Sequence, residues 1–182
     1  TFHYNSGYWG NNQSYGSLSD FASGLDFKSE VFFRMQASEV MIELEGPSGS
    51  HSMTTSISTT TLRTIFNSNT FVPTNLGRSA WKSFDGNTSL QSCCNQEGFN
   101  NYISSSDGMD VRVGILANGP DACDCSTPDS YIGIGRSNDS CYQDGTFDLG
   151  FPVMAGNATI CEDGVYDNGL RNIGTAGRIY IR

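Results

Sequence analysis

Six cysteines are the residues with the most evident chemistry in this chain of 182 residues. All of them lie in its second half, at Cys93, Cys94, Cys123, Cys125, Cys141 and Cys161. Their spacing argues against zinc, because Cys-Cys and Cys-x-Cys lack the usual separation between zinc ligands and neither histidine is nearby. An even number of cysteines in a polar, glycine-rich chain predicts disulfides and an oxidising, extracellular location.

The positions of the cysteines also suggest how they pair. A bond between the neighbours Cys93 and Cys94 would be strained, so each is expected to find a distant partner. The simplest arrangement joins them to Cys123 and Cys125 across an intervening strand and leaves the last two cysteines for each other. Six cysteines allow about 15 connectivities, and the sequence alone does not choose among them.

Carboxylates between residues 117 and 169 are the second group with potential chemistry. Calcium binds about six to eight oxygen atoms, which loops supply from carboxylates and carbonyl groups. This stretch offers Asp121, Asp124, Asp129, Asp139, Asp144, Asp148, Glu162, Asp163 and Asp167. It therefore predicts a calcium site, although the same Asp, Asn and Gly residues are also those that form turns.

Catalytic groups are not evident. His3 and His51 are the only histidines, and neither lies in a motif of a hydrolase or a metalloprotease. Glu39, Glu43 and Glu45 alternate with apolar residues and are expected to form a solvated strand face. We therefore expect a protein that is not an enzyme.

Hydrophobic periodicity predicts the elements that must position these residues. We expect strands over 30–35, 39–45, 111–115, 131–135 and 178–182, and short helices over 60–66 and 78–84. A turn at 46–49 follows the second strand, and residues 50–61 form either a loop or a weak edge strand. Residues 117–177 are expected to be long loops held by disulfides, which makes the class α+β with little helix.

Composition limits the function further. The length suits one domain, 16% of the residues are charged, 21 are glycine, and the formal net charge is −9. Such a charge disfavours nucleic acid, and no apolar run is long enough to span a membrane. The chain opens without the features of a signal peptide, as a mature secreted chain or a fragment would. Sequons for glycosylation occur at Asn12, Asn87, Asn138 and Asn157.

Several short motifs in order resemble fibrinogen-related domains, in particular their intelectin-like and invertebrate matrix variants. The matching pieces are Phe2-His3-Tyr4-Asn5-Ser6, Leu76-Gly77-Arg78, Trp81-Lys82-Ser83, Leu90-Gln91, Cys94-Asn95-Gln96-Glu97-Gly98-Phe99-Asn100, Val111-Arg112-Val113-Gly114-Ile115-Leu116, Asp129-Ser130-Tyr131-Ile132-Gly133-Ile134-Gly135, Asn157-Ala158-Thr159-Ile160-Cys161, Asp167-Asn168-Gly169 and Arg178-Ile179-Tyr180-Ile181-Arg182. The resemblance covers most of the chain.

The resemblance implies a twisted, mostly antiparallel sheet, short helices and a long calcium-bearing loop region. It implies calcium ligands at Asp163, Asp129 and Asp167, to which we add Asp148 from the same acidic stretch. Aromatic side chains beside such a calcium stack on bound sugars in this family, so Asp129, Tyr131 and Tyr166 are the candidate ligand-binding residues.

The chain departs from the family at three points. Thr1 begins after the family's first strands, so either the chain is partial or another chain supplies them. Cys161 matches a family cysteine whose disulfide partner lies in that upstream part. Cys141 is expected to take the place of this partner. In the run Cys125–Ser130, Ser126 and Pro128 replace an amide and a carboxylate of the intelectin calcium site.

Two functions follow as expectations. The first is a secreted, calcium-assisted domain that binds carbohydrate or a glycoprotein. The second is a structural module of an extracellular matrix, fibre or cell coat that assembles with other chains.

Overall fold

The computed structural model describes residues 2–103, 109–120, 123, 125–137, 155–159 and 165–182. In chain order its elements are η1 (Gly7–Trp9), α1 (Leu18–Ala22), α2 (Val31–Arg34), β1 (Ala37–Gly46), β2 (Gly49–Thr60), α3 (Leu62–Asn67), β3 (Val72–Pro73), α4 (Arg78–Lys82), β4 (Cys93–Asn101), β5 (Val111–Asn118), β6 (Ser130–Arg136), β7 (Ala155–Thr159), β8 (Asn172–Gly174) and β9 (Ala176–Ile181).

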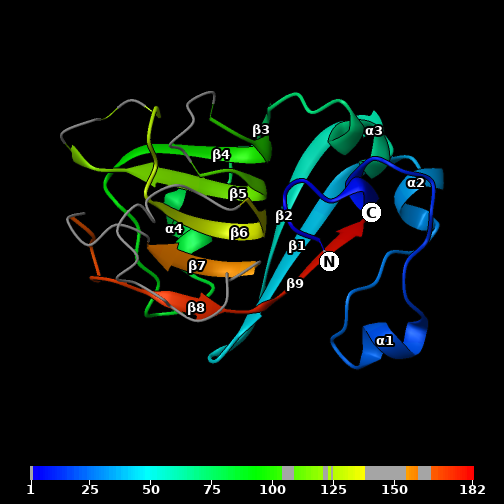
Figure 1. Ribbon diagram of the computed structural model, residues 1–182, viewed down its shortest axis with the longest axis horizontal. Helices are drawn as coiled ribbons and strands as arrows, with labels where there is room; N and C mark the ends of the chain where they lie inside the picture. The colour runs from blue at the N-terminus through cyan, green and yellow to red at the C-terminus, as the bar shows by residue number, and fades with distance from the viewer. Residues whose placement is uncertain (1, 104–108, 121–122, 124, 138–154, 160–164) are drawn as a thin grey trace.

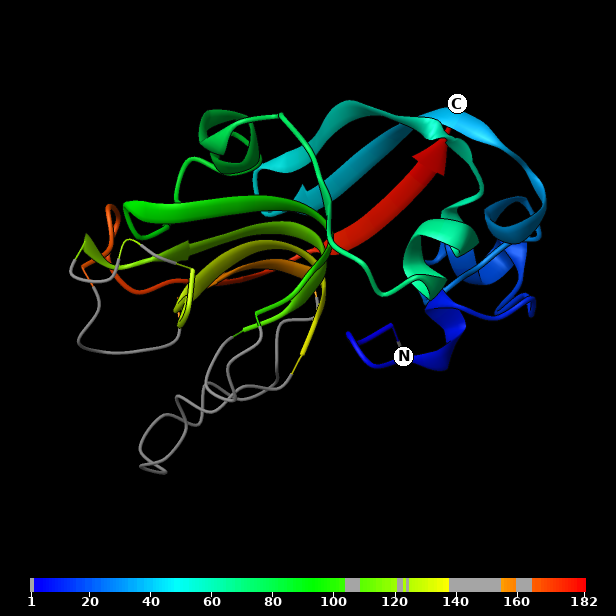
Figure 2. The same ribbon diagram turned by 90° about the horizontal axis from the view of Figure 1, so that it is seen from above.

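Within these described ranges the strands form two sheets, and every pairing is antiparallel (Figure 1). β3 to β8 make a six-stranded sheet in sequence order, whereas the other sheet has the order β2-β1-β9. The second sheet therefore joins an early hairpin to the last strand of the chain. Figure 2 shows the two sheets side by side, with the N-terminal segment and α1 to α3 beside the three-stranded one. The α+β class is confirmed at this level of detail.

The first hairpin follows the sequence pattern closely. Val40, Ile42 and Leu44 on β1 have no exposed surface, so the alternation predicted for 39–45 is confirmed. β1 turns into β2 after Gly46, where the turn was expected. Of the two alternatives for 50–61 the edge strand is correct, and its Ser and Thr residues suit a strand that pairs on one side only.

The main core lies between the two sheets. It combines β1 and β2 with one face of the six-stranded sheet and with the apolar sides of α3 and α4. Trp81 of α4 has no exposed surface, and every described position of β5 and β6 is buried. A second, smaller cluster is formed by Met109, Val111, Leu116, Tyr131 and Ala158.

The two helices predicted from the sequence are present as α3 and α4, whereas α2 was predicted to be a strand. α3 begins after Thr61, whose side chain accepts a hydrogen bond from Thr64 N at 3.1 Å, and α4 covers most of 78–84. The strand predicted over 30–35 is wrong, because this stretch is the helix α2. Its apolar residues are consecutive rather than alternating, and such a run does not distinguish a strand from a helix.

The expectation of long loops over 117–177 is also partly wrong. Besides the expected strand near 131–135, this stretch contains β7 and β8, and β4 was missed earlier in the chain. β4 and β7 are rich in Asn, Gly and other polar residues that carry little strand signal. Their side chains are satisfied by contacts with distant residues, which periodicity cannot reveal.

Candidate functional site

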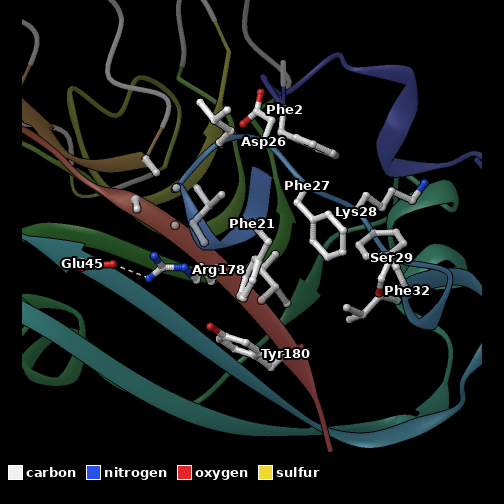
Figure 3. A pocket seen from close by; sticks show the side chains of 18 of the residues that line it. Phe2, Phe21, Asp26, Phe27, Lys28, Ser29, Phe32, Glu45, Arg178 and Tyr180 are labelled. Atoms are coloured by element: carbon white, nitrogen blue, oxygen red, sulfur yellow. Dashed lines mark hydrogen bonds and ion pairs between the residues drawn. The ribbon is translucent and has the colours of Figure 1, made fainter. Parts of the chain in front are cut away.

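A groove with a cavity volume of about 750 Å³ lies between the N-terminal segment and β9. We call it the β9 groove. One wall is formed mainly by residues from the segment 2–32, and the other mainly by Thr175 and β9 (Figure 3). Single residues from other elements complete the lining: Glu45, Leu62, Ile134, Ala155 and Gly174. Volumes of this size and an apolar lining are typical of ligand-binding sites.

Aromatic side chains form the wall contributed by the N-terminal segment. They are Phe2, Trp9, Phe21, Phe27 and Phe32. The Phe2 and Trp9 rings meet edge to face with centroids 5.4 Å apart, and Phe32 stacks on Phe66 of the core at 5.7 Å. The wall is therefore continuous with the hydrophobic core, which holds its rings in defined positions.

The β9 wall carries alternating polar and apolar side chains. Arg178 donates hydrogen bonds to Glu43 and Glu45 of the neighbouring strand β1, at 2.6 and 2.5 Å. These two bonds raise the pKa of Arg178 above its usual value, and the bond to Glu45 has the larger effect. The Phe21 ring lies near both Arg178, 5.8 Å from the guanidinium, and Tyr180, 6.5 Å between centroids (Figure 3).

Lys28 anchors the N-terminal wall from inside. Its ammonium group donates to the carbonyl groups of Tyr8 and Asn11 and to Asn11 Oδ1, and the side chain is almost fully buried. Burial, and then the neighbouring charge of Arg63, lowers the pKa of Lys28 to about 8. The backbone of Lys28 also pairs with Tyr15. Lys28 therefore bonds three places in the irregular stretch before α1, at Tyr8, Asn11 and Tyr15.

Two disulfides join β4 to the loop after β5. They link Cys93 to Cys123 and Cys94 to Cys125, in the two-against-two arrangement that the spacing suggested. Cys141 and Cys161 lie outside the described residues. The observed disulfides are compatible with an extracellular location.

Only some of the predicted calcium ligands lie in the part of the chain that the structure describes. Asp163 and Asp148 lie outside the described residues. Asp129 is half-buried, and Gln91 Nε2 donates to its Oδ2 at 3.0 Å. In the described ranges no group of three or more His, Cys, Asp or Glu side chains converges as metal ligands would.

In the structure Asp167 is an ion-pair partner, and its role as a calcium ligand stays a prediction. Its Oδ2 accepts from Arg78 at 2.8 Å and from Lys82, and its Oδ1 accepts from Leu90 N at 3.0 Å. Burial alone would raise the pKa of Asp167, but the hydrogen bonds from Lys82, Leu90 and Arg78 together lower it. The charge of Asp167 is thus paired with two cationic side chains in this structure.

Two further predicted sites are corrected by burial. Tyr131 has no exposed surface and belongs to the second core cluster, so it does not stack on a ligand. Asn157 is also fully buried, and its side-chain amide bonds Ser89 and the carbonyl of Tyr131, which leaves no room for a glycan. Asn12 and Asn87 are exposed and stay predicted glycosylation sites; Asn138 is outside the described residues. Tyr166 is half-buried, and its ligand role stays a prediction.

One serine and one histidine lie within hydrogen-bonding distance of each other. His51 Nε2 lies 3.0 Å from Ser83 Oγ, but that hydroxyl donates its proton to the carbonyl of Ala80. The nearby Asp85 is buried and accepts from Ser48 and from Asn87 N, so its carboxylate is engaged elsewhere. Among the described residues, no carboxylate is hydrogen-bonded to the His51 ring as the orienting acid of a triad would be.

Comparison with family models, curated proteins and solved structures finds no match to this chain. The resemblance to fibrinogen-related domains therefore stays a prediction from the sequence. No helix among the described residues has the length and apolarity needed to cross a membrane.

The β9 groove is the site that sequence reasoning missed. Its walls come from opposite ends of the chain, so no local motif points to it. The available signal was the number of aromatic residues before residue 34, in a segment without clear periodicity.

Proposed function

We propose that this chain is a non-enzymatic recognition module of an extracellular assembly, which binds apolar side chains of another polypeptide in the β9 groove. The observation that carries the proposal is the groove itself, with five aromatic side chains in one wall. Leu25 and Val31 of its lining are 61% and 40% exposed, and two further apolar side chains of the N-terminal part, Leu18 and Met35, are 76% and 53% exposed. A concentration of such residues beside a concavity marks an interaction surface.

The test uses a random-peptide phage library and the fluorescent probe bis-ANS. The combined variant Leu25→Asp and Val31→Asp places charge at two exposed positions of the groove lining, so folding should be kept. We expect selected peptides to be apolar, to compete with bis-ANS, and to bind the variant at least about tenfold more weakly. Circular dichroism checks that the variant is folded.

Leu170→Asp is the matched control. Leu170 is 42% exposed, close to the 40% of Val31, but it does not line the groove. Binding should be unchanged in this variant. The proposal is abandoned if no peptide or dye binds the native chain in a saturable way, or if the control loses as much affinity as the groove variant.

A second candidate function is calcium-assisted binding of carbohydrate. The observation in its favour is the support around Asp129, whose carboxylate is held by Gln91 and whose loop is tied to β4 through Cys125. Such support would hold an oxygen ligand in place before an ion arrives. We expect glycan-array signals that EDTA removes, calcium restores, and Asp129→Asn and Asp163→Asn each weaken. Signals that persist in EDTA would exclude this candidate.

A further inference from the structure

β9 is an edge strand with only one neighbour. In the sheet order β2-β1-β9 its partner is β1, and residues 176–181 pair with residues 45–40 in antiparallel register. An edge strand presents unpaired N–H and C=O groups that can recognise another extended chain.

The register identifies which groups are unpaired. Arg182 and Glu39 exchange two backbone hydrogen bonds, 3.0 and 3.4 Å, so they form a hydrogen-bonded pair. Because such pairs alternate along an antiparallel ladder, Tyr180 and Arg178 also direct their backbone groups to β1. The backbone N–H and C=O groups of Gly177, Ile179 and Ile181 therefore point away from β1. Within the part of the chain that the structure describes, no backbone hydrogen bond engages these three residues.

The β9 groove runs beside this free edge. All five residues from Gly177 to Ile181 line it, over about 16 Å of extended backbone. The free edge begins after Thr175, whose N–H donates to the carbonyl of Ala155. An extended chain in the groove could thus bond β9 and place alternate side chains against the aromatic wall, which includes Phe2, Phe27 and Phe32 (Figure 3).

Carboxylates outnumber cations by one around the groove when its neighbour Glu43 is included. The lining itself contains the carboxylates of Asp26 and Glu45 and the cations of Arg178 and Lys28. Glu43 lies beside the lining and shares the guanidinium of Arg178 with Glu45, and the Lys28 ammonium group is bonded to carbonyl groups inside. The whole chain carries a formal charge of −9. A complementary occupant therefore carries basic residues, and one of them belongs near Ala176, which pairs with Glu45.

We propose that an extended segment of another polypeptide binds as an additional strand along β9. It has alternating apolar residues, a basic end and backbone hydrogen bonds to Gly177, Ile179 and Ile181. This inference rests on the proposed function and names the partner of the same groove. Backbone bonds would supply affinity for any extended chain, and the aromatic pockets would select its alternate side chains.

The test measures amide hydrogen exchange by NMR on the full chain. The probe is a blocked peptide of alternating valine and threonine with a lysine at each end, added at millimolar concentration. We expect the amides of Gly177, Ile179 and Ile181 to exchange at least about tenfold more slowly with the peptide. The amides of Arg178 and Tyr180 already bond β1 and serve as internal controls, so their exchange should stay unchanged.

A peptide N-methylated at alternate residues keeps the side chains but loses the donors on one edge. Loss of binding with this peptide would support strand addition. Equal binding of both peptides, or binding without protection of the three amides, would overturn the inference and leave the proposed function intact. Protection that rises with protein concentration alone would assign the edge to a second copy of this chain and would also overturn it.

The remaining outcome separates the two proposals. If the peptide does not bind while bis-ANS occupies the groove, strand addition is wrong and the recognition site stands. If neither the peptide nor bis-ANS binds the groove, both proposals are wrong.

Discussion

Removal of both observed disulfides should lower the free energy of unfolding by about 5 kcal/mol, whereas removal of either one should cost only about 2 kcal/mol. The two bonds join residues 30 and 31 positions apart, and they close nearly the same loop. The first bond formed restricts the unfolded chain over that whole loop. The second then closes only the small ring between the two adjacent bonds, so its entropic effect is smaller.

Urea denaturation of three variants measures these differences in the free energy of unfolding. The first replaces Cys93 and Cys123 by alanine, the second replaces Cys94 and Cys125, and the third replaces all four cysteines. Cys123 is exposed and the other three are half-buried, so little packing is lost with the sulfur atoms. Each single-pair variant is the control for the other. Costs that simply add, with the fourfold variant equal to the sum of the pairs, would contradict the shared-loop account.

Glu97→Ala should destabilise the fold by about 4 kcal/mol, because this half-buried carboxylate of β4 accepts four hydrogen bonds. The donors are Thr74 Oγ1, Leu76 N, Gly77 N and Trp81 Nε1, at 2.7 to 3.2 Å. α4 begins after Gly77, which offers no side-chain cap, so Glu97 satisfies amides at that helix start from another element. Without it the buried Trp81 indole loses its acceptor.

Glu97→Gln is a sharper version of the same experiment. Three of the four donors bond Oε2, and only Gly77 N bonds Oε1. A glutamine oxygen at the Oε2 position keeps those three, so we expect a loss of about 1 to 2 kcal/mol in urea unfolding followed by tryptophan fluorescence. Glu39→Ala, on the exposed side of β1, is the control and should change stability by less than about 0.5 kcal/mol. If Glu97→Ala cost no more than this control, Glu97 would not fasten α4 to β4.

Elements that sequence reasoning found share one property: their signal is local. Val40, Ile42 and Leu44 alternate within seven residues, and Thr61 caps the helix that follows it directly. Close spacing also suggested the cysteine arrangement, although the choice of connectivity came only from the structure. In each case a residue and its immediate neighbours carry enough information, because side-chain periodicity and capping act over one or two turns.

Polar strands and buried polar side chains could not be predicted from the sequence, because their stabilising contacts are with distant residues. Asn157 resembles a glycosylation site by its neighbours, yet its amide bonds Ser89, which is 68 residues away. Asp167 looks like a turn residue or calcium ligand, yet its oxygens accept from Arg78 and Lys82, more than 80 residues away. A hydrogen bond across such distances leaves no periodic trace in the sequence.

By itself, the sequence determined that this chain is a disulfide-bonded, acidic α+β protein with an alternating strand over 39–45, a turn after it and short helices. Only the tertiary structure decided where a partner could bind. The β9 groove requires Phe21, Phe27 and Phe32 to face a strand that begins at residue 176, and an open edge exists only once the sheet order is known. The physical reason is that burial and strand pairing join residues by their position in space, which local patterns do not specify.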